Sequence, residues 1–496
     1  MKRVASGFLP VITVDRSASQ PLHRQIYNSF RTAIVDGRLH PGQRIPSSRV
    51  LALEIGVSRF PVLNAYAQLL AEGYLATRVG AGTVVSASLP EQLTTAAPAR
   101  TKTAVLHRGP RSVARRCSHL PAKEDYPWMI HSGPFRVGQI AFDEFPWSIW
   151  SSLIARRSRN LNTAAIHYGD LQGHESLRRS IANYLRISRS VRCEPEQVLI
   201  VNGSQQALEI TARVLLNSGD HVWIENPSYR LARDVFALNE CRLVPVPVDA
   251  EGLNVAAGVK KCRKARAAFV TPSHQFPLGV TLSASRRLQL IEWAHRSGAW
   301  IIEDDYDSEY RYESLPIASL QGLDTNSRVI YIGTFSKVVF PSLRLGYLVV
   351  PPDLIDRFVL MRRVIDLGMP TLYQQVLADF IEEGHFARHI RRMRVHYGGL
   401  RRVLFDNLIE ILGDMVEIVG DEAGMHLTVL LRSGHRDEEL ARAAVSHKLS
   451  LWPLSRSYVG EPRQGWILGF GGTTAKEIPD AVRRLRNLLI VNSLAA

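Results

Sequence analysis

From about His131 to Ala496 the sequence alternates short apolar runs with longer stretches of helical periodicity. The runs that we predict to be strands are 197–201, 221–225, 242–248, 267–271, 299–304, 329–333 and 345–350. Amphipathic stretches such as 204–217 and 283–297 lie between most of them. This alternation predicts an α/β fold with a mainly parallel, doubly wound sheet that is covered on both faces. Ligands bind such sheets at the carboxyl ends of the strands, so we expect the functional residues there.

The bulk composition limits the class of protein. With 496 residues the chain is too long for one ordinary core, so we expect two or three units. No uninterrupted run of eighteen apolar residues occurs, which argues against a membrane span. The apolar part of the N-terminus is short and is broken by Gly7 and Pro10, unlike a signal peptide, so we expect a cytoplasmic location. The four cysteines are scattered, without metal-ligand spacing.

Residues 15–87 form a separate pattern of three helices followed by a hairpin. Ser47 or Ser48 can cap the second helix and Ser58 the third, with a turn at Gly56 between them. The stretch 74–86 alternates like two short strands around a glycine-rich tip. The pattern predicts a winged helix-turn-helix. The apolar residues that we assign to the helical stripes are Ile26, Phe30, Ile34, Val35, Val62, Tyr66, Leu69 and Leu70.

Residues 88–130 join the two parts and contain Ala, Thr, Pro and several basic residues without a helix or strand period. This composition predicts a basic flexible linker, which is either a solvated tether or an arm that contacts phosphates. The formal net charge of the chain is +15, which favours a polyanionic partner such as nucleic acid. An even scatter of arginines over a large surface would give the same net charge without such a partner.

Lys337 lies just beyond the predicted strand 329–333, in "GTFSKVVFPSLRLGY". Burial there would lower the pKa of its ammonium group and free the amine to attack a carbonyl, as in a Schiff base. The alternative is a lysine whose stem packs on apolar residues while its head reaches water.

Asp304 and Tyr306 end the predicted strand 299–304, in "EDDYDSEYRY". A carboxylate at this place can pair with a protonated pyridine nitrogen, the arrangement that makes pyridoxal phosphate an electron sink, and the phenol can donate to the phenolic oxygen of that ring. An acidic loop or a divalent-metal site is the alternative, although the sequence offers no further ligands to complete a metal shell.

Two further strand ends, and the one that carries Lys337, offer groups for a flat, phosphorylated ligand. The turn before the helix 204–217, in "NGSQQALEI", presents amides and a hydroxyl to a phosphate, although any capped helix looks similar. Thr334 and Ser336 add hydroxyls, and Arg344 can bind an anion through two hydrogen bonds. Tyr229, in "NPSYR", can stack on a heterocycle or can be an ordinary loop aromatic.

These residues carry a resemblance to a known family. Residues 131–496 resemble the fold type I aminotransferases through "YGDLQGHESLR", "NGSQQAL", "TPSHQFPLG", "EDDYDSEYRY" and "GTFSKVVFPSLRLGY". The N-terminal part resembles the winged helix-turn-helix of GntR-type regulators through "GQRIPSSRVLALEIGVSRFPVLNAYAQLLAEGYL" and "RVGAGTVV". Both parts in this order resemble the MocR/GabR subfamily of transcriptional regulators over nearly the whole chain.

The resemblance implies pyridoxal 5'-phosphate as the cofactor and a role for each matching residue. Lys337 would form the Schiff base, and Asp304 would pair with the pyridine nitrogen. Tyr168 would reach the phosphate of a neighbouring subunit, which implies a homodimer with shared sites. The remaining implied contacts are Tyr306 to the phenolic oxygen, Tyr229 as the stacking ring, and Ser204, Gln205, Thr334 and Arg344 around the phosphate.

Two departures from the aminotransferase pattern bear on activity. Phe276 stands where those enzymes have the asparagine of "N-P-x-G". Ile467 stands where many of them have the arginine that grips a substrate carboxylate, and Arg456 and Arg463 are nearby but out of register. Efficient transamination is therefore less expected than cofactor binding.

On the DNA side, the helix that opens at Ser58 is expected in the major groove, with Arg59 and Asn64 at base edges and Arg49 on a phosphate. Arg78 and the tip residues Gly80 and Gly82 would approach the backbone or the minor groove. A dimer would need an operator with repeated half-sites.

Two functions remain after these observations. The first is a regulator of transcription that senses pyridoxal phosphate or an amine or amino-acid effector. The second is an aminotransferase with an accessory DNA-binding domain, and weak or half-transamination could persist in either. A DNA-binding module whose large domain is only a scaffold is disfavoured, because a scaffold does not need Lys337 beside Arg344.

Overall fold

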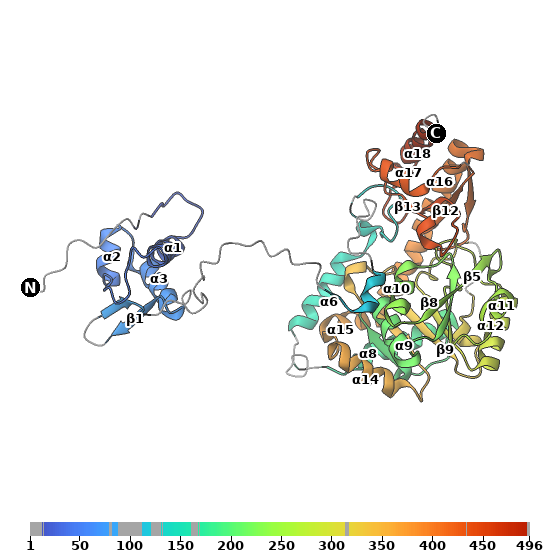
Figure 1. Cartoon of the computed structure of the whole chain (residues 1–496), viewed down its shortest axis with the longest axis horizontal. Coiled ribbons are helices and arrows are strands. Elements are labelled where there is room, and N and C mark those ends of the chain that lie inside the picture. Colours follow the sequence, from blue (N-terminus) through green and yellow to red (C-terminus); the bar gives the residue numbers. More distant parts are fainter. Residues whose placement is uncertain are drawn as a thin grey trace, which may run out of the picture. The chain divides into compact units, whose positions relative to one another are not determined.

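The computed structural model describes residue 12 and residues 14–78, 82–87, 112–120, 130, 132–159, 167, 169–312, 317–432 and 434–493. The chain divides into two compact units, Met1–Arg111 and Ser112–Ala496 (Figure 1). Each unit has its own buried apolar cluster, so each is described by itself.

The first unit contains three helices and a two-stranded antiparallel hairpin. In the hairpin, Leu75 pairs with Val85 and Arg78 pairs with Gly82. The buried residues of the three helices and the hairpin meet in one core. The structure therefore has the expected winged helix-turn-helix architecture. Its elements are α1 (Leu22–Val35), α2 (Ser48–Glu54), α3 (Arg59–Ala71), β1 (Leu75–Arg78) and β2 (Gly82–Val85).

Two details of the first unit differ from the sequence prediction. Val35 is 47% exposed and does not share the buried stripe of α1. It lies nine residues after the fully buried Ile26, which is two and a half helical turns and hence the opposite face. Ser58 occupies the N-cap position of α3, but its side chain makes no capping hydrogen bond. Ser47 does cap α2, because its side chain accepts a hydrogen bond from the amide of Val50.

The second unit is built on an eight-stranded sheet in the order β3-β10-β9-β8-β7-β4-β5-β6. β4, β5, β7, β8 and β9 run parallel, while β10 is antiparallel to both of its neighbours and β6 is antiparallel to β5. All seven strands predicted from the sequence are present in it. Their bounds are β3 (Val198–Val201), β4 (His221–Asn226), β5 (Arg242–Asp249), β6 (Gly252–Leu253), β7 (Ala267–Val270), β8 (Trp300–Asp305), β9 (Val329–Thr334) and β10 (Gly346–Val349).

Helices cover both faces of this sheet, because side chains from the same strand alternate between two buried clusters. Ile224 packs on the face that α9, α10 and α14 cover, whereas its neighbour Trp223 packs on the face of α11, α12 and α13. α6, α8, α15 and α16 pack against β3, β10 and the end of β9. The helices are α6 (Trp147–Arg159), α8 (Glu175–Arg189), α9 (Ser204–Leu215), α10 (Arg230–Leu238), α11 (Val255–Cys262), α12 (Ala284–Ser297), α13 (Leu320–Leu323), α14 (Ile355–Asp366), α15 (Thr371–Glu382) and α16 (His385–Leu412).

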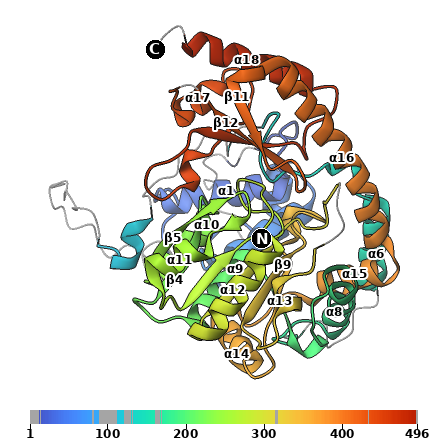
Figure 2. The ribbon, with the colours of Figure 1, turned by 90° about the vertical axis from the view of Figure 1, so that its right-hand side faces the viewer.

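A second, four-stranded antiparallel sheet lies near the C-terminus, in the order β11-β12-β14-β13. Figure 2 shows α17 and α18 near this sheet and the long helix α16 running from it toward α15. Of its strands, the sequence pattern had indicated only the one that contains Ile467. The elements are β11 (Val416–Val419), β12 (His426–Leu431), α17 (Asp437–Ala444), β13 (Trp452–Pro453), β14 (Gly465–Gly469) and α18 (Ile478–Ser493), and the short 3-10 helices are Arg115–His119, Phe142–Glu144, Pro195–Gln197, Pro341–Leu343, Gly413–Met415 and Ser455–Ser457.

Within the described ranges, none of the helices combines the length and the apolar character that crossing a membrane requires.

Candidate functional site

A cavity of about 260 Å³ lies at the carboxyl ends of the parallel strands. Eight of the nine residues that the resemblance assigns to the cofactor line this one cavity, although they come from four separate stretches of the chain. Tyr168, the ninth, lies outside the residues that the structure describes. The eight are Ser204, Gln205, Tyr229, Asp304, Tyr306, Thr334, Lys337 and Arg344.

Lys337 follows β9 and places its amine inside the cavity. Burial lowers the pKa of the Lys337 ammonium group, and the charges of Asp307 and Asp304 oppose this effect. Gly138 gives the amine room: a Cβ atom on Gly138 would lie 2.9 Å from Nζ of Lys337. A lysine with a lowered pKa presents a larger neutral fraction at neutral pH, and the neutral amine is the nucleophile.

Asp304 is at the end of β8 and is only 5% exposed. Its Oδ1 atom is buried and has no hydrogen-bond partner among the described residues. Burial raises the pKa of Asp304 to about 7, and the nearby Asp305 and Asp307 add to the shift. A buried carboxylate oxygen without a partner is unfavourable, so the site has a place for a cationic N–H donor. The protonated nitrogen of a pyridine ring fits that requirement.

Tyr306 is held by His274, a buried residue that the sequence pattern did not indicate. Its hydroxyl donates to the carbonyl oxygen of His274 at 2.9 Å and lies 3.0 Å from Nδ1 of the same residue. Nδ1 of His274 is also 3.0 Å from Oδ2 of Asp307. These contacts fix the hydroxyl of Tyr306 at the wall of the cavity.

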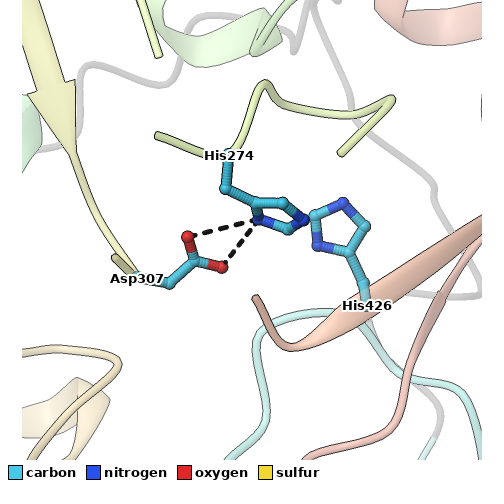
Figure 3. Close-up of side chains that lie close together, drawn as sticks. All are labelled: His274, Asp307 and His426. Atoms are coloured by element: carbon cyan, nitrogen blue, oxygen red, sulfur yellow. Dashed lines mark hydrogen bonds and ion pairs between the residues drawn. The ribbon is translucent and has the colours of Figure 1, made fainter. Parts of the chain in front are cut away.

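His426, from β12, lies against His274 with ring centroids 4.7 Å apart (Figure 3). Its Nε2 atom donates to the carbonyl oxygen of Pro277 at 3.0 Å. Burial lowers the pKa of His426 well below its ordinary value, and His274 adds to this, so the ring is neutral. Ligand atoms of His274, Asp307 and His426 lie within 4.8 Å of one another. No histidine lies near the acidic stretch 304–307 in the sequence, but the fold brings His274 and His426 to Asp307.

The opposite end of the cavity is suited to an anion. The helix α9 begins at Ser204, directly after Gly203, which has a φ of +79°. Arg344 donates through Nη2 to the carbonyl oxygen of Asn202 at 3.0 Å, which holds its guanidinium beside this helix start. Oγ1 of Thr334 donates to Oγ of Ser336 at 3.1 Å. A helix N-terminus, hydroxyl groups and an arginine together form a typical phosphate site.

Tyr229 supplies a half-buried ring between these two ends. Burial raises the pKa of its hydroxyl to about 12, and the charge of Asp304 adds to the effect. Phe276 stands edge-on to Tyr229, with centroids 5.6 Å apart. Both rings line the cavity, where an aromatic heterocycle could stack on one of them.

Among the described residues that line the cavity, none is an arginine at the position of the carboxylate-gripping arginine of the aminotransferase pattern. Ile467 is fully buried in β14 and packs with Leu278, Leu430 and Leu454. Arg456 forms an ion pair with Glu438, and Arg463 forms one with Glu417. The wall in this region instead consists of Val137, Phe276, Met425, His426 and Trp452.

The residues singled out for DNA lie in α2, α3 and the hairpin. Arg49, Ser58, Arg59, Asn64, Arg78 and Gly82 are all exposed, while Gly80 lies outside the described residues. Nε of Arg59 donates to Oγ of Ser48 at 3.1 Å, which ties the start of α3 to α2. The exposed face of α3 and the hairpin therefore carry the polar groups that the sequence assigned to DNA.

Comparison with known proteins agrees with both parts of this description. Residues 22–85 match the family described as bacterial regulatory proteins of the gntR family, and residues 146–485 match aminotransferase class I and II. The chain is 40% identical to the probable rhizopine catabolism regulatory protein MocR of Rhizobium meliloti, over 97% of this chain and 96% of that protein. It is 30% identical to the pyridoxine biosynthesis transcriptional regulator PdxR of Corynebacterium glutamicum, over 90% of this chain and 91% of that protein.

The second unit also resembles solved enzyme structures. The kynurenine aminotransferase of Pyrococcus horikoshii, whose crystal structure is a complex with PMP, is 26% identical to this chain with a TM-score of 0.72. The match covers 77% of this chain and 97% of the enzyme. The enzyme is thus similar to the second unit, whereas the two regulators are similar to nearly the full length. The chain belongs to the MocR/GabR subfamily of GntR-type regulators, in which a winged helix-turn-helix precedes an aminotransferase-like domain.

Proposed function

We propose that this protein regulates transcription by binding double-stranded DNA through its first unit and pyridoxal phosphate through Lys337 in its second unit. The observation that carries the proposal is the pairing, in one cavity, of a buried amine of lowered pKa with a buried carboxylate oxygen that lacks a partner among the described residues. When bound, the cofactor supplies an aldehyde and an electron-withdrawing ring.

Each residue of the cavity then has a definite task. Lys337 presents its amine to the aldehyde, and Asp304 accepts the hydrogen bond of the ring nitrogen. The hydroxyl of Tyr306 lies at the wall of the cavity, where it can orient the ring of the cofactor. Tyr229 offers its ring for stacking on the cofactor ring, and the start of α9 together with Arg344 holds the phosphate.

The response to an effector follows from competition at Lys337. An amine effector that takes the place of Lys337 changes which arrangement of the chain is favoured, and only a difference in affinity between two arrangements can alter DNA binding. We place the protein in a homodimer, in which Tyr168 reaches the neighbouring phosphate and two DNA-binding units contact repeated half-sites.

An aminotransferase with an accessory DNA-binding domain is the second candidate. The full set of Lys337, Asp304, Tyr229 and Arg344 in one cavity favours it. The buried Ile467 and the ion pairs of Arg456 and Arg463 weigh against it for amino-acid substrates, because a carboxylate brought into a buried site needs a cationic partner.

The cofactor part of the proposal is tested with the purified full-length protein. Pyridoxal phosphate should produce a visible absorption band, and borohydride should then fix the cofactor covalently to the protein. Lys337→Ala should lose both signals, whereas Lys260→Ala, which removes an exposed lysine of α11, should retain them. Failure to take up the cofactor, or covalent fixation in Lys337→Ala, would contradict the proposal.

The choice between the two candidates needs two further measurements. We expect the protein to retain DNA from its own upstream region, with retention that changes when cofactor or amines are added. We also expect little transfer of amino groups to a keto acid. Rapid multiple turnover without DNA binding would establish the aminotransferase instead.

A further inference from the structure

The recognition helix α3 carries an exposed aromatic residue that the DNA contacts assigned above do not use. Phe60 is 70% exposed and takes no part in the core of the first unit. Single exposed apolar side chains are common on proteins, so exposure alone would not single it out. Phe60 is singled out by its position on α3.

Phe60 is the second residue of α3 and shares a face with Asn64. Residues four apart on a helix lie one above the other. The opposite face of α3 carries the buried residues Val62, Ala65, Tyr66 and Leu69. Phe60 and Asn64 therefore project from the side of α3 that faces away from the core. In a helix-turn-helix the N-terminal part of the second helix meets the base edges in the major groove.

The chemistry of the major groove matches this pair of side chains. Thymine presents a C5-methyl group there, which apolar side chains such as phenylalanine contact, while asparagine bonds to the N6 and N7 atoms of adenine. Leu63, also exposed at 42%, adds apolar surface one turn after Phe60. We propose that Phe60 reads the methyl group of a thymine in each half-site, beside the base that Asn64 contacts. This inference rests on the proposed DNA-binding function.

The test uses a duplex that the full-length protein selects from a random-sequence pool. Each thymine is replaced in turn by deoxyuridine, which removes the methyl group and leaves base pairing intact. At one position of each half-site, the wild-type protein should bind about fourfold more weakly after the replacement, which corresponds to one buried methyl group. At the other positions the affinity should stay the same.

Variants of the protein test whether Phe60 causes the loss of affinity that follows replacement of that one thymine. Phe60→Ala should bind the thymine duplex about fourfold more weakly or worse and should be indifferent to the replacement. Phe60→Leu should retain part of the sensitivity. Leu53→Ala removes an apolar side chain of α2 that is 79% exposed, and this variant should keep the full wild-type sensitivity. Because Phe60 does not pack in the core, its variants should melt at the wild-type temperature.

The outcomes separate this inference from the proposed function. If the wild-type protein binds the duplex but is indifferent to every methyl group, or if Phe60→Ala keeps the penalty, Phe60 does not read thymine while DNA binding stands. If no sequence is selected and no duplex is retained, the DNA-binding function itself is wrong and this inference is wrong with it.

Discussion

The surroundings of Asp304 disfavour the ionised form of its carboxyl group. Its carboxylate lies at the end of a buried strand, and one oxygen has no partner among the described residues. An ionised carboxylate in such a place is unstable unless a cationic donor arrives. The residue thus favours a bound cation and penalises an empty site.

This cost of ionisation predicts a pH dependence of stability in the protein without cofactor. Folding raises the pKa of Asp304 from 3.8 to about 7. The stability that the protonated group contributes is complete below its unfolded pKa and is lost as the pH rises through about 7. The loss is at most about 4 kcal/mol. We therefore expect Asp304→Asn to unfold at a higher urea concentration than the wild type at pH 8, with a smaller difference at pH 5.

The same variant should bind pyridoxal phosphate more weakly, because a neutral amide no longer pairs with a protonated ring nitrogen. Asp353→Asn, at an exposed carboxylate, is the control and should follow the wild type in both measurements. Equal urea curves for Asp304→Asn and wild type at both pH values would show that the carboxylate is satisfied in another way.

Much of the cavity could be predicted at the scale of residues, and part of it could not. Lys337, Asp304 and Arg344 were accessible because they follow strands directly, and strand ends of a parallel sheet converge. His274 and His426 were not, because a single histidine carries no signal until its partners are known. These two residues are 152 positions apart and meet only through the packing of the two sheets.

At the scale of elements, the start of α9 gives a sharp test of the phosphate end. Gly203 has positive φ, and a Cβ atom there would lie 2.9 Å from Nη2 of Arg344. Gly203→Ala should therefore lower stability by about 1–3 kcal/mol through backbone strain and should also displace the guanidinium. We expect a clear loss of affinity for pyridoxal phosphate and a smaller loss for pyridoxal, which lacks the phosphate.

Gly219→Ala is the matched control for this experiment. Gly219 also has positive φ, but nothing lies within 4 Å of the added Cβ atom. It should share the loss of thermal stability and keep its affinity for the cofactor. Equal affinity losses in both variants would assign the effect to strain and not to the position of Arg344.

The elements themselves were predictable to different degrees. The strands of the large sheet are continuous apolar runs between helices, so their sequence pattern is strong. The four-stranded sheet was largely missed, because β13 has only two residues and most of β11 is not buried. Such strands take their structure from neighbours that are distant in sequence, which a local pattern does not contain.

At the scale of the whole molecule, the net charge of +15 predicts a strong dependence of DNA affinity on salt. The stretch 88–130 contains seven Lys and Arg residues, of which the first four, Arg100, Lys102, Arg108 and Arg111, lie outside the described residues. If this stretch is a solvated tether, changing all four to Gln should leave the slope of log affinity against log salt unchanged. If it is a phosphate-contacting arm, the slope should fall by about 0.9 for each phosphate that the variant no longer neutralises. We expect the first result, measured by titration of a labelled duplex.

The division of the chain was visible in the sequence as a change of pattern. The helical first part, the aperiodic stretch 88–130 and the alternating second part differ in period and composition. Each part has the pattern that its own buried core requires, which is why the boundary could be predicted.

The cavity has walls from both sheets of the second unit: Asp304 and Thr334 belong to the large sheet, and His426 and Trp452 belong to the small one. A molecule that fills it therefore ties the two sheets together and resists their separation. At a hundred times its Kd, such a ligand adds about 2.7 kcal/mol to the free energy of unfolding. Cellular proteases degrade the opened form of a protein, so the amount of this regulator, and not only its affinity for DNA, would follow the supply of its ligand.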